Sequence, residues 1–220
     1  PGSDAVLGGG ARLQVTNALR LGSNAVILVE GKNRTGQVEG AWRGDGALIH
    51  AGSLHLAPGA RVHADGQGYL GGADRGQPGN GPGGGGPAGD HGVSGGGGYG
   101  GTGASPSVRP QVYGGPAYGS TELPLDLGSG GGGAEYSHPG AGGGMIRFAV
   151  RDEFHLDGVV SADGEGASHS AGGGSGGSIL VEAGLLSGSG VFRAQGGGTP
   201  EGAGGGGGGR IAVYYDRSDY

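Results

Sequence analysis

Short runs of alternating apolar and polar residues recur along the chain, and each run begins at a glycine. The clearest runs begin at Gly144, Gly177 and Gly209, and weaker copies begin at Gly10 and Gly46. A period of two residues is typical of β-strands, because successive side chains of a strand point to opposite faces. The five glycines are 36, 98, 33 and 32 residues apart, so one unit repeats with a single long interruption.

A second alternating segment follows every copy except the last. Residues 19–31 align without gaps to residues 54–66, and further copies span 154–164 and 185–196. Each segment closes with an acidic or amide residue followed by glycine, a pair that is typical of turns. We therefore expect two or three short strands in each repeat, joined by Gly-rich corners.

These repeats predict an all-β fold, a short parallel β-solenoid with coils of about 33 residues, in which each strand pairs with its counterparts in neighbouring coils. An antiparallel sandwich, which also alternates with a period of two, is the alternative. The fixed repeat favours the solenoid. The positions that we expect to point inward are Leu19, Leu21, Leu54, Leu56, Val62, Ile146, Phe148, Val160, Ile179, Val181, Phe192, Ile211 and Val213.

The composition changes this picture, because 65 of the 220 residues are glycine and only 33% are hydrophobic. Such a composition is typical of disordered chains, but a net charge of −6 is too small to hold the chain open by self-repulsion. Ordering a glycine in regular structure costs about 0.5–1 kcal/mol more than ordering an alanine. Some regular structure must offset this cost, since the apolar residues are too few for a conventional core.

The glycines gather between the second and third coils. Gly-rich segments cannot pack through side chains, but extended threefold helices can approach closely and hydrogen-bond laterally through their backbones. We expect a polyglycine-II-type bundle, with an ordered but irregular mass of loops as the alternative. The chain is then a single domain, 1–220, with two β coils in 1–65, a Gly-rich insertion in 66–143 and further coils with Gly-rich corners in 144–220.

Several classes of protein are excluded or disfavoured by residue content. Without cysteine there are no disulfides, iron–sulfur clusters or Cys-ligated zinc. Lys32 is the sole lysine and the arginines do not cluster, so the chain lacks the electrostatic footprint of a nucleic-acid-binding protein. No apolar run approaches the 18 residues of a membrane span, so none is expected.

Carboxylates and glycine motifs do not indicate an active site. Most acids fall at turns or stand alone on strands, where solvated surface charge is the expected role. The best local cluster is Arg151, Asp152 and Glu153, whereas a solenoid polysaccharide lyase or hydrolase would present paired acids on one outer face. The Gly-x-Gly-x-x-Gly matches neither follow a strand nor open a helix. We therefore expect no catalytic residues and no cofactor.

Two histidines fall at equivalent outward positions. His55 and His155 share this position in two coils, and Arg20 holds it in the first coil, so we expect these side chains to form a ladder across the surface. A metal site would need a third ligand, for which only His50 and His63 are at hand. We expect the surface ladder and no bound metal.

The tyrosines are the best candidates for ligand contact. Exposed rings beside bare glycine backbone could stack on sugars or on a partner chain, or they could cover the Gly-rich segments and provide their only side-chain packing. The five candidates in the Gly-rich insertion are Tyr69, Tyr99, Tyr113, Tyr118 and Tyr136.

A set of Gly-rich strings carries a resemblance to a known family. The strings span residues 65–72, 97–103, 112–114, 125–133, 171–179 and 204–215. Together they resemble the Gly-rich module of very large bacterial surface and secreted proteins, including some that carry RHS/YD repeats. The resemblance covers about residues 46–216 and implies an extracellular location and an adhesion-like or scaffold role. The glycine runs are also loosely similar to the polyglycine-II slabs of phage tail-tip adhesins and of anaplastic lymphoma kinase.

We therefore expect a non-enzymatic extracellular or cell-surface module with a structural or adhesive role. Its partners would be further copies of itself or neighbouring modules of a longer chain, because stacked coils leave open strand edges that invite a filament or matrix. A carbohydrate-binding adhesin tip that uses the tyrosine-bearing loops is the alternative, with a glycan as partner. A solenoid polysaccharide-degrading enzyme ranks below both.

Overall fold

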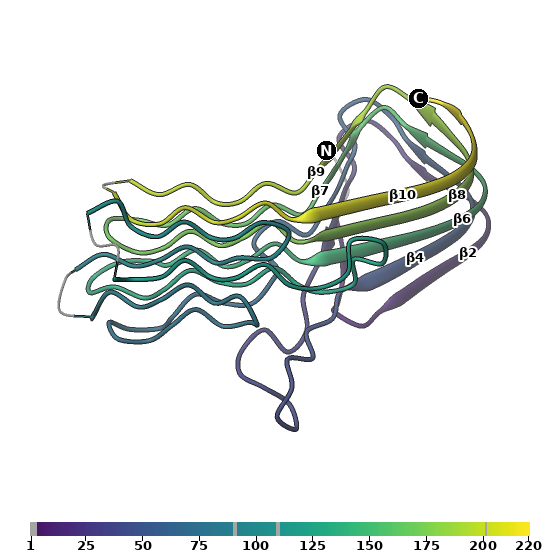
Figure 1. Ribbon diagram of the computed structural model, residues 1–220. Coiled ribbons are helices and arrows are strands. Elements are labelled where there is room, and N and C mark those ends of the chain that lie inside the picture. The colour runs from purple at the N-terminus through teal and green to yellow at the C-terminus, as the bar shows by residue number, and fades with distance from the viewer. Residues whose placement is uncertain (1–3, 90–91, 109–110, 201) are drawn as a thin grey trace.

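The computed structural model describes residues 4–89, 92–108, 111–200 and 202–220, and the fold is all-β (Figure 1). The strands form two five-stranded sheets in which every ladder is parallel. Because an antiparallel sandwich would pair its strands in opposite directions, that alternative is wrong. No α-helix is present in the described ranges.

The two sheets differ in the length of their strands. The first sheet has short strands in the order β1 (Asp4–Leu7), β3 (Val26–Val29), β5 (Arg61–His63), β7 (Val159–Ser161) and β9 (Val191–Arg193). The second sheet has long strands in the order β2 (Arg12–Leu21), β4 (Ala47–Leu56), β6 (Met145–Leu156), β8 (Ser178–Gly188) and β10 (Arg210–Asp219).

The chain alternates between the two sheets, and each sheet follows sequence order. Equivalent residues of successive repeats therefore lie side by side in straight rows. One such row crosses the second sheet through Leu13, Ile49, Phe148, Val181 and Val213. The sequence repeat thus sets the strand register, because each apolar position faces the same position one repeat away.

The core lies between the sheets and is built mostly from the predicted inward residues. Nine of them are buried: Leu21, Leu54, Leu56, Val62, Ile146, Phe148, Val160, Ile179 and Val181. Leu19, Phe192 and Val213 are partly buried against the same core. Ile211 contradicts the prediction, since 41% of it is exposed. It lies on β10, which pairs on one side only among the described strands, so no neighbouring row covers it.

Four of the long strands, β2, β4, β6 and β8, each join two segments that the alternation pattern treats as separate strands. The ladders shift register midway, for example between Ala51 and Leu54, and the sheet bends there (Figure 1). Gly52 and Gly184 lie at this bend. A Cβ at Gly52 would come within 2.5 Å of the Asn17 carbonyl oxygen, so the bend excludes a side chain there. The bend thus turns the predicted corner without breaking the strand.

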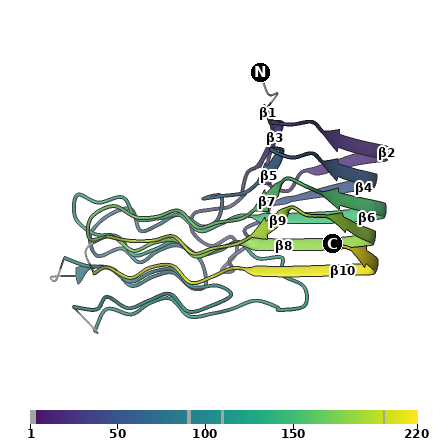
Figure 2. The same ribbon diagram turned by 90° about the horizontal axis from the view of Figure 1, so that it is seen from above.

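Gly-rich segments extend from one end of the sheets as wavy, nearly parallel chains that lie several deep in both views (Figure 1 and Figure 2), and together they form what we call the Gly-rich layer. Neighbouring segments are joined by backbone hydrogen bonds across long sequence separations. The amide of Gly131 donates to Gly140, that of Gly172 to Gly132, and that of Gly173 to Gly204, at 2.9–3.1 Å between nitrogen and oxygen. Backbone pairing therefore continues beyond the strands, where side chains are almost absent.

Candidate functional site

The Gly-rich layer leaves no room for side chains at most of its glycines. A Cβ at Gly131 would lie 1.9 Å from the Gly172 carbonyl oxygen, and one at Gly172 would lie 1.9 Å from that of Gly95. Both contacts are with backbone, which cannot rotate away as a flexible side chain can. Glycine is required here for close approach, and the layer presents backbone rather than functional side chains.

Two of the five candidate tyrosines are buried and hold the layer against the sheets. Tyr69 is 2% exposed, and its hydroxyl accepts a 2.8 Å hydrogen bond from the amide of Gly44. Tyr99 is fully buried, with its hydroxyl 2.6 Å from Ser178 Oγ. Burial raises the pKa of Tyr99 to about 12, so the phenol stays neutral. Neither ring has a free face for a sugar.

Tyr118 is half-buried and extends the same cluster. Its hydroxyl donates to the carbonyl of Leu127 and accepts a 2.9 Å bond from Ser129 Oγ. Its ring centroid is 4.8 Å from that of Tyr99. Burial raises its pKa well above the ordinary value. Tyr69, Tyr99 and Tyr118 thus provide side-chain packing for the layer, the second of the two roles weighed for the tyrosines.

Tyr113 and Tyr136 are the exposed members of the five, with 56% and 93% of their surface accessible. Tyr136 has a positive φ of 54°, a conformation that projects it from a tight turn. It lines a surface groove of about 640 Å³ with Arg75, Glu135 and His138. Tyr136 thus combines an exposed ring with an adjoining hollow.

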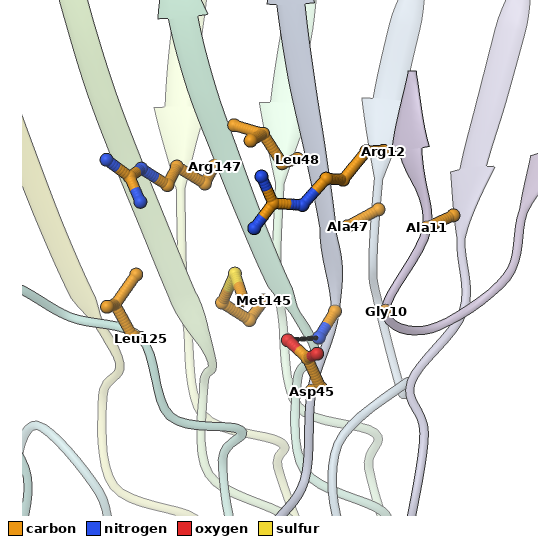
Figure 3. Close-up of a pocket in the computed structure, with 10 residues that line it drawn as sticks. Gly10, Ala11, Arg12, Asp45, Ala47, Leu48, Leu125, Met145 and Arg147 are labelled. Carbon is orange, nitrogen blue, oxygen red and sulfur yellow. Dashed lines mark hydrogen bonds between the residues drawn. The ribbon is translucent and has the colours of Figure 1, made fainter. Parts of the chain in front are cut away.

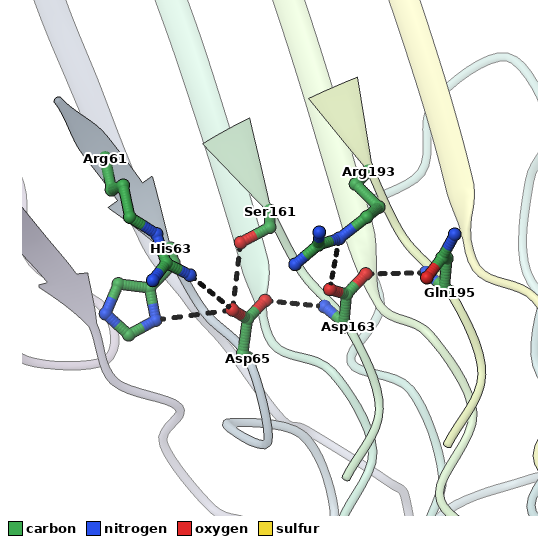
Figure 4. A network of polar contacts seen from close by, with 7 residues as sticks. All are labelled: Arg61, His63, Asp65, Ser161, Asp163, Arg193 and Gln195. Carbon is green, nitrogen blue, oxygen red and sulfur yellow. Dashed lines mark hydrogen bonds and ion pairs between the residues drawn. The ribbon is translucent and has the colours of Figure 1, made fainter. Parts of the chain in front are cut away.

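Two aspartates form a ladder at one corner of the repeats (Figure 4). Asp65 Oδ1 accepts the amide of Asp163, and Asp163 Oδ1 accepts the amide of Gln195, both at 2.8 Å. Each carboxylate therefore binds the backbone one repeat further on. Arginines complete the row, since Arg61 pairs with Asp65 and Arg193 with Asp163. The recurring acid- or amide-glycine pairs mark this ladder in the sequence, although sequence reasoning gave them only turn and surface roles.

His63 lies against the same ladder. Its Nδ1 atom is 3.6 Å from Asp65 Oδ2, and that nitrogen is buried without a hydrogen-bond partner among the described residues (Figure 4). Burial lowers the pKa of His63, while the Asp65 carboxylate opposes the shift. The described residues contain no group of three or more side chains suited to hold a metal ion.

The predicted His55–His155 neighbourhood is confirmed. The two residues are register partners with ring centroids 5.8 Å apart, and Arg20 precedes them in the same row. Burial lowers the pKa of His55, and the positive charge of Arg20 adds to the effect. This ladder is one row that crosses β2, β4 and β6 on the outer face of the second sheet.

Ser187 and Asp157 flank His155 in an arrangement that sequence reasoning missed. His155 Nδ1 is 2.8 Å from Ser187 Oγ, and Nε2 is 3.0 Å from Asp157 Oδ2. The Ser187 hydroxyl donates its proton to Glu153, at 2.7 Å, rather than to the imidazole. Ser187 is also only 7% exposed. A hydroxyl that is buried and bonded in this way is not set up as a nucleophile, so the cluster fits a structural network.

A small cavity of about 190 Å³ lies where the second sheet meets the Gly-rich layer (Figure 3). Arg12 and Arg147 extend their guanidinium groups beside Leu48 and Met145. Arg147 pairs with Glu182 at 2.8 Å. Asp45 Oδ1, at the other side, accepts the amide of Gly46. Charged and apolar side chains therefore line the space together, and its volume is below the 300–1,000 Å³ or so of ordinary ligand pockets.

The comparisons with known proteins give no relatives. The described residues contain no helix long and apolar enough to cross a membrane. No family model matches the chain, and neither the curated proteins nor the solved structures include a significant match.

Proposed function

We infer that this chain is a non-enzymatic structural or adhesive module of a bacterial surface or secreted protein. Its core would be a short parallel β-solenoid, and its Gly-rich segments a polyglycine-II-type bundle that extends from the coils. Such a module works by shape and rigidity rather than by chemistry at one site. The parallel register of equivalent repeats and the long-range hydrogen bonds between glycine segments support this architecture.

The observation that carries the proposal is the close approach of bare backbones. In most of the layer a single methyl group would collide with a neighbouring main chain, as at Gly131 and Gly172. A chain that keeps glycine at such a density holds a rigid backbone layer at a high entropic cost. A mechanical or spacing role would explain why the chain accepts the entropic cost of ordering so many glycines. The resemblance to Gly-rich modules of surface proteins supports the extracellular location.

Single-molecule force spectroscopy tests the structural role directly. With the chain tethered at residues 4 and 219, we expect one cooperative rupture that releases the strands and the Gly-rich segments together. A Gly-rich layer that extends at low force while the sheets stay folded would contradict the proposed mechanical role. Repeating the pull from residue 66 to residue 144 isolates the Gly-rich segment within the same folded protein.

A second candidate function is glycan binding at Tyr136. The exposed ring, the groove of about 640 Å³ and the Arg75–Glu135 ion pair, at 3.3 Å, together form a surface that could stack on and hydrogen-bond to a sugar. A glycan array tests it. Binding lost in Tyr136→Ala but kept in Tyr113→Ala would support this site, whereas an array without any bound glycan would eliminate it.

A further inference from the structure

The two end strands of the second sheet have unpaired edges among the described residues. β2 pairs only with β4, and β10 pairs only with β8. The first sheet likewise ends at β1 and β9. A parallel edge presents free amide and carbonyl groups that favour the addition of another strand. Both ends of the stack therefore offer the same kind of surface.

Exposed large apolar side chains within the strands are confined to these ends. All of those recorded lie on β1, β9 or β10, or directly after β10: Val6, Val191, Ile211, Tyr214, Tyr215 and Tyr220. Interior strands bury their large apolar residues between neighbouring rows. Ile211, Tyr215 and Tyr220 lie in inward rows, so one more repeat would cover them. Val6, Val191 and Tyr214 lie in outward rows and would gain a neighbour on one side only.

We propose that a second copy of this chain stacks head to tail on the first, with its β2 beside β10 and its β1 beside β9. This inference rests on the proposed structural role and names the partner and the register. The rows of residues within one copy would continue into the next copy, so they define how the strands of the two copies pair. Ile211 would meet Ala11 of the partner copy, and Val213 would meet Leu13, since these residues end and begin the same inward rows.

Charge complementarity favours this occupant. One outward row runs from Arg20 on β2 through His55, His155 and Ser187 to Asp219 on β10. Head-to-tail stacking would place Asp219 of one copy about 4.8 Å from Arg20 of the next along that row. Five other charged residues of the end strands would face neutral ones: Arg210 opposite Gly10, Arg12 opposite Ala212, Arg217 opposite Ala18, Arg193 opposite Val6 and Asp4 opposite Val191.

Tyr220 would have to shift its side chain in the stacked pair, because its hydroxyl bonds the Gly190 carbonyl that the Asp4 amide of the other copy would meet. Its ring lies 6.1 Å from that of Phe192 over the end of the core, and its hydroxyl donates to the Gly190 carbonyl. Tyr220 follows Asp219 and so falls in the inward row that begins at Leu21. Stacking would seat it against Leu21 of the partner copy.

Disulfide trapping tests the proposal, because the chain has no cysteine of its own. Within one copy, Arg20 and Asp219 are four strand spacings apart, about 19 Å. A disulfide needs Cα atoms within about 7 Å. The double variant Arg20→Cys/Asp219→Cys can therefore be linked only between copies. Under oxidation we expect a ladder of covalent dimers, trimers and longer species.

Matched controls decide whether the cross-linked oligomers report the proposed pairing of Arg20 with Asp219. Arg12→Cys/Asp219→Cys uses the same two strands in different rows and should remain monomeric. A mixture of the two single variants, Arg20→Cys and Asp219→Cys, should give mainly the mixed dimer. Equal ladders in both double variants, dimers of one single variant alone, or no linked species would each overturn the proposal.

Charge reversal provides a second measurement that does not depend on oxidation. Arg20→Asp should weaken self-association, measured by sedimentation, about three- to tenfold, and Arg20→Asp/Asp219→Arg should restore it. Failure of the double reversal to restore association would contradict the row pairing. A chain that stays monomeric but ruptures as one unit under force would end the stacking proposal and leave the structural role intact.

Discussion

At the residue scale, glycine here is a requirement of packing, not of turn geometry alone. We expect Gly131→Ala to destabilise the protein by about 3 kcal/mol or more, because the added methyl would meet Gly172 backbone at 1.9 Å. Gly208→Ala is the matched control, since a Cβ there meets nothing within 4 Å and the change should stay within about 0.5 kcal/mol. Urea denaturation measures both. Equal effects would contradict a close-packed layer.

The half-buried imidazole of His63 makes stability depend on pH. Burial lowers its pKa below the ordinary 6.5, so as pH falls the unfolded chain takes up the proton first. The free energy of unfolding should decline below pH 6.5 and show no such contribution above it. His63→Gln should flatten part of this decline, with His55 supplying some of the remainder. Denaturation curves measured across this range check the prediction, and a His63→Gln slope equal to that of the unchanged protein would contradict it.

At the element scale, the aspartate ladder ties successive repeats together. Asp163→Ala removes the acceptor of the Gln195 amide and the partner of Arg193, and should cost about 1–3 kcal/mol. Asp163→Asn keeps an acceptor oxygen and should cost less. Glu122→Ala removes an exposed carboxylate and should change little. Thermal unfolding followed by circular dichroism ranks the stabilities of the three variants. An Asp163→Ala variant as stable as Glu122→Ala would show that the aspartate ladder does not stabilise the repeats.

Strand positions could be predicted from the sequence, and strand continuity could not. Alternation from Gly144 and Gly177 located β6 and β8, because a half-buried strand repeats every two residues. The alternation pattern did not predict that two segments join into one bent strand, because the bend depends on backbone contacts of Gly52 and Gly184 with neighbouring strands. Ile211 followed the inward pattern but lies at an end row, and the pattern carries no information on what covers an end.

At the scale of the whole molecule, the candidate site was the least predictable part. The tyrosines share one sequence context, yet Tyr99 is buried and Tyr136 is 93% exposed. Their environments are set by segments distant in sequence, as when Tyr99 meets Ser178. Composition predicted that the glycines must form regular structure, whereas the partners of each segment emerge only from the three-dimensional arrangement.

Amide hydrogen exchange of the glycine runs tests the central claim most directly. We predict that the amides of 130–133 and 172–177, and those of Gly204, Gly206, Gly207 and Gly209, are protected as strongly as those of β6 and β8. Their carbonyl partners lie in other segments of the same cooperative layer. Gly40 is exposed in a turn where an added Cβ would meet nothing within 4 Å, and its amide should exchange fast. Glycine runs that exchange as fast as Gly40 while β6 and β8 stay protected would contradict a backbone-bonded layer.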